Sequence, residues 1–322
     1  LNYNASSFDS FGPFHGIKRD VLEGGIRMPT LVRWPGNIPA QSINSTPSQF
    51  HDWLPTMCAV AGVSAPAISD GVSLLPQLTG QGTARKSTVY VEYINTRNTP
   101  AYPEFDLHHQ NRVRQQMQVV FVDGYKGIRT GIQSADDDFM IFDVDADHRE
   151  SMNLSGANDY FTDLQQRMKD RVLQIRRPNE SAPRPYDAAP VPALSKGSKS
   201  SDITWKAFEG DFPWVPQTAD LNPANSGQSN KVDAGVSASA TVIEYRGTIE
   251  AKETGEQTFT VDSHGGAILR LHNAVVVDNE SVVDGERETK GTIILEKGFH
   301  PFTLTYRVGS INSPSLSFSY SQ

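Results

Sequence analysis

The stretch from residue 16 to residue 36 constrains the fold of this chain most, and it reads GIKRDVLEGGIRMPTLVRWPG. Its adjacent glycines, Gly24 and Gly25, permit backbone angles closed to other residues, so we expect a sharp turn there. The run from Met28 to Trp34 is mostly apolar and stops at a Pro-Gly pair, which predicts a strand buried in a mixed sheet. Lys18 precedes the turn, and its ammonium group is a compact charge suited to one oxygen of a tetrahedral anion.

The residues alone leave two interpretations of these charges open. Lys18 suits an anion site, but a solvated surface lysine is the commoner case, and Glu23 with Arg27 indicates a structural ion pair. The spacing G-x-K-x-x-x-x-E-G-G-x-R-x-P followed by W-P-G resembles the second half of the catalytic domain of sulfatases. That resemblance implies that Lys18 is a catalytic lysine that holds a sulfate oxygen, while Glu23 and Arg27 keep a structural role.

Length and charge restrict the remaining possibilities. The 322 residues suffice for two domains and a third small unit. A net charge of -8 without a basic block argues against a nucleic-acid partner, and no apolar run approaches the roughly 18 residues of a membrane span. The chain begins at Leu1 with neither Met nor a signal peptide, and the resemblance starts in mid-domain. We therefore expect an N-terminal portion of the same protein outside this sequence.

The chain has one cysteine, Cys58. The resemblance implies a formylglycine nucleophile, made from a cysteine or serine in a C-x-P-S-R motif, and calcium held by aspartate and asparagine. Cys58 lies in an apolar helical run without an arginine four residues later, so we predict a core residue. The aspartates and the Asp-Asn pair of the family have no match either. We assign no metal ligand to this chain and expect the nucleophile and the calcium ligands in the missing N-terminal part.

Periodicity divides residues 46–180 into helices and strands. The segment from Phe50 to Gly62 predicts a helix with one apolar face, and a short helix follows near residue 75. Strands are expected at Thr88–Tyr93, Met117–Val122, Tyr125–Arg129 and Phe139–Val144, and a helix at Asp159–Arg176. The motifs D-x-x-P-T and D-G-x-S-L-L-P-x-L also resemble those of sulfatases. The resemblance implies the small C-terminal subdomain of that family, an antiparallel sheet with a helix packed on it.

A long polar segment, residues 95–114, joins two of these strands, and loops of this length are often functional. In sulfatases the corresponding region borders the substrate cleft. The resemblance therefore implies substrate contacts from His108, His109 and Arg112, together with His15. For the two adjacent histidines, a plain surface position is an equal alternative.

Residues 142–154 resemble the sulfatase pattern Y-D-L-x-x-D-P-x-E-x-x-N-L, with His148 in place of proline. Their alternating aspartates also resemble the start of an EF-hand loop. His148 and Leu154 stand where that loop needs glycine and glutamate, so we expect no calcium there.

Beyond residue 180 the composition changes twice. Residues 181–202 are rich in Pro, Ser and Gly and predict a linker. From Ile203 onward strands are expected at Val242–Glu250, Gln257–Asp262, Ala267–Leu271, Gly291–Leu295 and Phe302–Arg307. The runs Trp205–Gly210, Tyr245–Ile249, Glu253–Phe259 and Gly291–Pro301 resemble, in this order, the protective-antigen-type β-barrel domain of carbohydrate-active enzymes. The usual S-D-D-G turn is Ser-His-Gly-Gly at residues 263–266, which argues against an acidic calcium site there.

The predicted fold class is α/β, a partial alkaline-phosphatase-like sulfatase fold with an α+β C-terminal subdomain, followed by an all-β barrel or sandwich. The predicted domains are residues 1–85, residues 86–180, residues 181–202 as a linker, and residues 203–322 as a β-domain expected to bind carbohydrate. The predicted function is sulfate ester hydrolysis on a sulfated polysaccharide or aryl sulfate, in the periplasm or outside the cell. This chain alone is expected to be inactive. The alternatives are a non-catalytic carbohydrate-binding or scaffold chain, and a related hydrolase of another ester such as a phosphonate.

Overall fold

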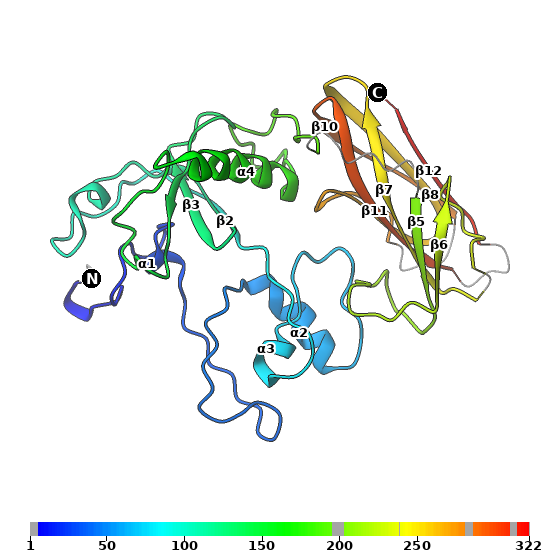
Figure 1. Ribbon diagram of the computed structural model, residues 1–322, viewed down its shortest axis with the longest axis horizontal. Helices are drawn as coiled ribbons and strands as arrows, with labels where there is room; N and C mark the ends of the chain where they lie inside the picture. Colours follow the sequence, from blue (N-terminus) through cyan, green and yellow to red (C-terminus); the bar gives the residue numbers. More distant parts are fainter. Residues whose placement is uncertain (1–5, 195–202, 238, 281–285, 310–313, 322) are drawn as a thin grey trace. The chain divides into compact units, whose positions relative to one another are not determined.

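The computed structural model describes residues 6–194, 203–237, 239–280, 286–309 and 314–321. The chain divides into two units. The first holds residues 1–36, 88–172 and 178–188, and the second holds residues 37–87, 173–177 and 189–322. Figure 1 shows a sheet with a long helix in the first unit and a β-rich domain in the second. Residues 37–87, which the sequence assigns to the catalytic domain, share the second unit with this β-domain.

The first unit is built on an antiparallel sheet with the strand order β1-β2-β3-β4. Its elements are η1 (Ser6–Phe8), α1 (Glu23–Ile26), β1 (Tyr90–Asn95), η3 (Leu107–His109), β2 (Gln115–Val122), β3 (Tyr125–Thr130), β4 (Met140–Phe142) and α4 (Asp159–Ile175). The predicted strands and the predicted helix of this subdomain are thus confirmed to within a few residues.

The two faces of this sheet carry different parts of the chain. On one face, α4 packs with its buried apolar residues at helical spacing. Gly127 in β3 makes room for it, because a Cβ there would lie 2.5 Å from the Met168 sulfur. On the other face, Val21 and Leu22 pack in one cluster with Val119 of β2 and other sheet residues. The stretch that opens the family motif is therefore held directly against the sheet.

The predicted strand from Met28 to Trp34 is wrong for the chain as described. These residues have no regular secondary structure, and Met28 and Leu31 are 79% and 100% exposed. A strand needs a neighbour to satisfy its N–H and C=O groups. Among the described residues no strand pairs with this run, so the apolar pattern alone does not produce one.

The sequence predicts that the glycine pair forms a sharp turn, but the structure shows a different need for glycine at these two positions. Gly24 and Gly25 lie in α1, and neither has a positive φ. A Cβ on Gly24 would lie 2.3 Å from the carbonyl oxygen of Gly16, and one on Gly25 would lie 2.5 Å from that of Asp20. Close approach of two backbone segments therefore excludes a side chain at both positions.

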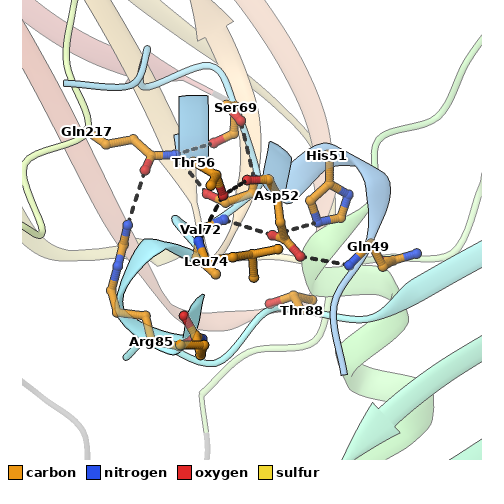
Figure 2. Close-up of polar contacts among 12 residues, drawn as sticks. Gln49, His51, Asp52, Thr56, Ser69, Val72, Leu74, Arg85, Thr88 and Gln217 are labelled. Carbon is orange, nitrogen blue, oxygen red and sulfur yellow. Dashed lines mark hydrogen bonds and ion pairs between the residues drawn. The ribbon is translucent and has the colours of Figure 1, made fainter. Parts of the chain in front are cut away.

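In the second unit, the two short motifs of residues 37–87 are joined by buried side chains (Figure 2). This segment contains η2 (Phe50–Asp52), α2 (Trp53–Val60) and α3 (Leu75–Thr79). Asp52 accepts hydrogen bonds from the backbone N–H groups of Gln49, at 2.7 Å, and Val72, at 2.8 Å. Thr56 accepts one from the N–H of Leu74 at 2.8 Å. The Asp and Thr of D-x-x-P-T therefore order the backbone of D-G-x-S-L-L.

Helix α2 forms where the sequence predicts it, but its predicted apolar face is exposed. Phe50, Leu54 and Met57 are 89%, 52% and 56% exposed. The buried side of the helix instead carries Thr56 and Cys58, which confirms the predicted burial of the cysteine. The sequence therefore predicts the helix correctly, but it does not predict which side of the helix is buried.

The β-domain forms one sheet with the order β10-β8-β11-β7-β5-β6, and β9 and β12 also pair with β8. Its strands are β5 (Ile203–Phe208), β6 (Asn225–Ser229), β7 (Val242–Ala251), β8 (Gly255–Leu271), β9 (Ala274–Asp278), β10 (Glu286–Leu295), β11 (Gly298–Val308) and β12 (Leu316–Ser321). Its core includes Tyr245, Phe259 and Leu304. The sequence predicts no strands at β5, β6, β9 and β12. Part of the predicted linker, residues 195–202, lies outside the described residues.

Strand β8 is continuous, although two strands and a turn were predicted over the same residues. It pairs with β10 up to His264 and with β11 from Gly265 onward. Gly265 has a φ of +110°, and a Cβ there would lie 2.3 Å from the carbonyl oxygen of Arg307. The glycines at residues 265–266 therefore let one strand bend and change partners, a role typical of glycine in barrels.

Candidate active-site region

A buried group of charges ties the family stretch to the sheet. Lys126 Nζ in β3 lies 2.7 Å from Glu23 Oε1 and 2.8 Å from Glu150 Oε1. The second oxygen of Glu150 accepts the backbone N–H of Glu23 at 2.7 Å. Arg27 Nη2 lies 2.6 Å from Glu23 Oε2, which confirms the predicted structural ion pair. We refer to Glu23, Lys126 and Glu150 as the buried charge group.

The pKa values of the two carboxyls in this group are shifted in opposite directions. Burial by itself would raise the pKa of Glu23, but the charges of Lys126 and Arg27 hold that pKa below its ordinary value. At Glu150, burial outweighs the attraction of Lys126 and raises the pKa. Removing one partner from such a group leaves an uncompensated buried charge. The group therefore fixes the backbone at Glu23 strongly.

Lys18 lies five residues before this anchor and is exposed. Among the described residues its ammonium group makes no hydrogen bond and no ion pair. The backbone around it is ordered by bonds from the Asp20 N–H to the Ile17 oxygen, at 2.9 Å, and from the Gly24 N–H to the His15 oxygen, at 2.7 Å. The stretch thus presents an unpaired cation on an ordered backbone.

The structure brings His15 and His109 together as a buried pair. Their Nδ1 atoms are 2.7 Å apart, and Arg149 Nε donates to His15 Nε2 at 2.7 Å. A guanidinium can only donate hydrogen bonds, so His15 Nε2 must be the unprotonated acceptor. The proton of His15 is therefore on Nδ1, from which it is donated to His109 Nδ1. The His109 proton then sits on Nε2, a buried atom without a hydrogen-bond partner in the described residues. We call His15 and His109 the histidine pair.

The pKa values agree with two neutral rings. Burial, followed by the charge of Arg149, lowers the pKa of His15. Burial, acting first, and the nearby His108, His15 and Arg112, acting in the same direction, together lower the pKa of His109 to about 3. Both rings are therefore neutral near pH 7, as the hydrogen bonds require.

The other two predicted contacts surround this pair. His108 is exposed, and its ring centroid lies 4.0 Å from that of His109. Arg112 is half-buried; its Nη2 lies 3.5 Å from Thr130 Oγ1, and burial lowers its pKa. In this structure His15 and His109 have no open face to solvent. Direct substrate contact by any of these residues, and by Lys18, stays a prediction.

Two residues of this cluster were missed by the sequence analysis as site residues. Arg149 donates to His15, and Asp106 Oδ2 lies 3.9 Å from His15 Nδ1. Asp106 also accepts the hydroxyl hydrogen of Ser151. Arg149 directly precedes Glu150 in the motif of residues 142–154, and this adjacency is the signal that could have identified it. Asp106 lies in the long polar segment of residues 95–114, next to the predicted contacts His108 and His109.

The described residues do not offer a calcium site. Within the ranges that the structure describes, no group of three or more His, Cys, Asp and Glu side chains is placed to hold a metal ion. In the segment that resembles an EF-hand, Asp143 accepts the backbone N–H of Ala146, and Asp147 accepts that of Met152. These carboxylates therefore cap backbone turns. In the same ranges, no helix has the length and apolar character needed to cross a bilayer.

Comparison with known proteins assigns both parts of the chain. Residues 12–178 match the family described as N-sulphoglucosamine sulphohydrolase, C-terminal, and residues 197–318 match the PA14 domain. The chain is 34% identical over 88 residues to steryl-sulfatase of Mus musculus, covering 27% of this chain and 14% of that protein. It is 27% identical over 177 residues to N-acetylgalactosamine-6-sulfatase of Canis lupus familiaris, covering 52% and 34%.

A bacterial protein is also similar to part of the chain. The N-acetylglucosamine-6-O-sulfatase of Bacteroides thetaiotaomicron is 30% identical over 143 residues, covering 44% of this chain and 24% of that protein. The chain thus spans about a third or less of the length of the curated relatives it matches. The first family match alone extends over half of the sequence, from the Lys18 stretch through helix α4. This chain therefore belongs to the N-sulphoglucosamine sulphohydrolase C-terminal family of sulfatases, followed by a PA14 domain.

Proposed function

We propose that this chain is the C-terminal portion of an enzyme that hydrolyses sulfate esters, with Lys18 as its contribution to the reaction. The observation that carries the proposal is the unpaired, exposed Lys18 on a backbone anchored by the buried charge group. Sulfate carries its charge on oxygen atoms, and an ammonium group binds one such oxygen well. In the transition state Lys18 would neutralise charge that develops on the sulfate and on the leaving oxygen.

The rest of the machinery would come from a preceding part of the same protein. We propose that this part supplies the formylglycine nucleophile and the calcium ligands. Two exposed apolar regions support a covering partner: residues 28–34 in the first unit, and the shared face of η2 and α2 with Phe50, Leu54 and Met57 in the second. Soluble monomers rarely expose apolar patches of this kind without an interaction that covers them. The covered α2 face would then become the core that the helical pattern predicts.

The proposed substrate is a sulfated polysaccharide or an aryl sulfate. Two of the relatives are named for sulfated amino sugars, and a PA14 domain follows the sulfatase part. We also propose that the protein lies in the periplasm or outside the cell, as its membership of the sulfatase family suggests. The PA14 domain also favours a second candidate, a non-catalytic chain that binds carbohydrate. The first candidate predicts turnover of a sulfate ester by the full-length protein, and the second predicts none.

Turnover of a fluorogenic aryl sulfate by the full-length protein, with calcium present, tests the proposal. Lys18→Ala should lower kcat by roughly two to three orders of magnitude, the effect of removing one preorganised charge donor. Lys86→Ala removes another exposed lysine and should leave kcat unchanged. Equal turnover in Lys18→Ala and wild type would refute the role of Lys18, and no turnover by the wild type would favour the carbohydrate-binding candidate. Residues 1–322 alone should show no turnover, because Lys18 can attract sulfate but cannot attack sulfur.

A further inference from the structure

The outer face of the strands β5, β6 and β7 carries a polar grid. Alternation along the strands points Trp205 and Tyr245 toward the core and leaves the other positions on the outside. These three strands lie side by side (Figure 1). Their antiparallel register aligns the outer positions in two rows across the strands. One row is Gln228, Thr204 and Arg246, and the other is Ser226, Lys206 and Glu244.

These six residues line a groove with a volume of about 410 Å³, which lies in the usual range of ligand sites. Strands lie about 4.8 Å apart and alternate residues about 6.8 Å apart, so the grid covers roughly 10 by 7 Å. That area suits one or two sugar rings. The six side chains of the grid are polar or charged, and Trp205 and Gly227 complete the lining of the groove.

Two of the side chains form a rigid, preorganised edge. Glu244 is buried and accepts hydrogen bonds from Arg246, at 2.8 Å from Nε and 3.1 Å from Nη2, as well as from the Thr218 hydroxyl. The guanidinium of Arg246 is exposed and is thus held in one orientation while keeping N–H groups for a ligand. A fixed donor loses less entropy on binding than a mobile one.

The remaining side chains are available to a ligand. Lys206, Ser226 and Gln228 are exposed, and their side chains make no hydrogen bond or ion pair with the described residues. Lys206 and Arg246 against Glu244 leave a local charge of +1, in a chain whose net charge is -8. The groove therefore offers mainly hydrogen-bond donors and a positive charge, with an amide and hydroxyls beside them.

We infer that this groove binds an acidic saccharide, with its sulfate or carboxylate on Lys206 and Arg246 and its hydroxyls on Gln228 and Ser226. The inference rests on the proposed function in one respect, because it would let the β-domain hold the same polymer that the sulfatase part acts on. The groove itself is separate from Lys18, so binding can be measured without any turnover.

Calorimetric titration of residues 1–322 tests the groove, with dextran sulfate as the probe and unsulfated dextran of the same length as its control. At about 0.15 M salt, where screening suppresses diffuse attraction, wild type should bind dextran sulfate and not dextran. Lys206→Ala should weaken binding about tenfold, the value of one charge-assisted hydrogen bond. Lys206→Ala combined with Gln228→Ala should weaken it further. Lys252→Ala, at an exposed lysine outside the groove, should change the Kd by less than about twofold.

Three results would overturn the inference: unchanged binding in Lys206→Ala, equal losses in Lys206→Ala and Lys252→Ala, or equal binding of dextran and dextran sulfate. Thermal unfolding of each variant separates lost binding from lost folding, and Lys206 is exposed, so the fold should persist. If binding follows these expectations but the full-length protein shows no turnover, the proposed enzyme is refuted and the groove is retained. If the full-length protein shows turnover but Lys206→Ala leaves binding unaltered, the proposed enzyme is retained and the groove is refuted.

Discussion

The sulfatase sheet and the PA14 domain are both antiparallel, but they are stabilised by different interactions. The first keeps the buried charge group, the histidine pair and Arg129 inside its structure. The second has a continuous apolar core. Its buried polar side chains include Glu244, Asn279 and His300, and the buried Tyr306 hydroxyl donates to the His264 oxygen at 2.8 Å. Buried charges position a segment specifically at a cost in stability, whereas apolar burial stabilises without direction. The segment that presents Lys18 is therefore positioned by the buried charge group, whose contacts are directional.

The largest effect should come from Lys126→Met. It leaves the carboxyls of Glu23 and Glu150 buried without their shared cation, which typically costs about 3–5 kcal/mol. Hydrogen exchange should rise first in residues 16–27 and β3, while the β-domain keeps its protection. Lys290→Met is the matched control, because it breaks an exposed pair with Glu288 that contributes about 1 kcal/mol at most. Uniform exchange throughout Lys126→Met would contradict a local anchoring role.

A core truncation in the β-domain should come next. Leu304→Ala removes a fully buried side chain of β11 and should cost roughly 2–5 kcal/mol. Urea unfolding followed by exchange should show the loss in the β-domain, with little change in the sheet of the first unit. The exposed Leu54→Ala should cost far less in residues 1–322. If the two leucines cost the same, the contrast between an apolar core and an exposed face would be wrong.

Acidification should distinguish the two regions further. A histidine whose folded pKa is lowered stays neutral in the folded state, while the unfolded chain takes up a proton below its ordinary value of 6.5. Stability is then complete above pH 6.5 and falls by about 1.4 kcal/mol per pH unit for His109, toward its pKa of about 3. His15 acts in the same direction. The raised pKa of Glu150 has the opposite effect, because the folded protein then takes up this proton more readily than the unfolded chain as the pH falls.

Comparing the free energy of unfolding of wild type and His109→Gln between pH 7 and pH 5 isolates the contribution of His109 to acid stability. The glutamine can still accept the His15 hydrogen but cannot titrate, so its stability should depend less steeply on pH. His108→Gln, at the exposed neighbour, should keep the wild-type slope. Identical slopes in wild type and His109→Gln would show that the histidine pair does not control acid stability.

The smallest effect should come from Gln217→Ala within the second unit. The Gln217 amide donates to the oxygens of Ser69 and Gly71, both at 3.0 Å, and accepts from Arg85 at 3.3 Å (Figure 2). Its loss should cost about 1–2 kcal/mol and raise hydrogen exchange in residues 69–74. Gln228→Ala, at an exposed position, serves as the control. Unchanged exchange in Gln217→Ala would show that residues 37–87 do not depend on the β-domain.

Several features of this protein followed from the sequence by itself. The hairpin of β2 and β3, helix α4 and the central strands of the β-domain are local patterns of period two or 3.6, and the structure confirms them. The family stretch and its ion pair between Glu23 and Arg27 were also readable, because both depend on residues close together in the chain. Cys58 was placed in the interior by its apolar neighbours alone.

Other features depend on residues far apart in sequence, and only the tertiary structure decided them. Lys126 lies 103 residues from Glu23, and His109 lies 94 residues from His15, so no local pattern could pair them. The run of residues 28–34 has a strand's composition but no neighbouring strand among the described residues, and the apolar face of α2 likewise has no partner there. Periodicity states which face of a segment is apolar. Whether that face is buried depends on what packs against it, which a single segment does not encode.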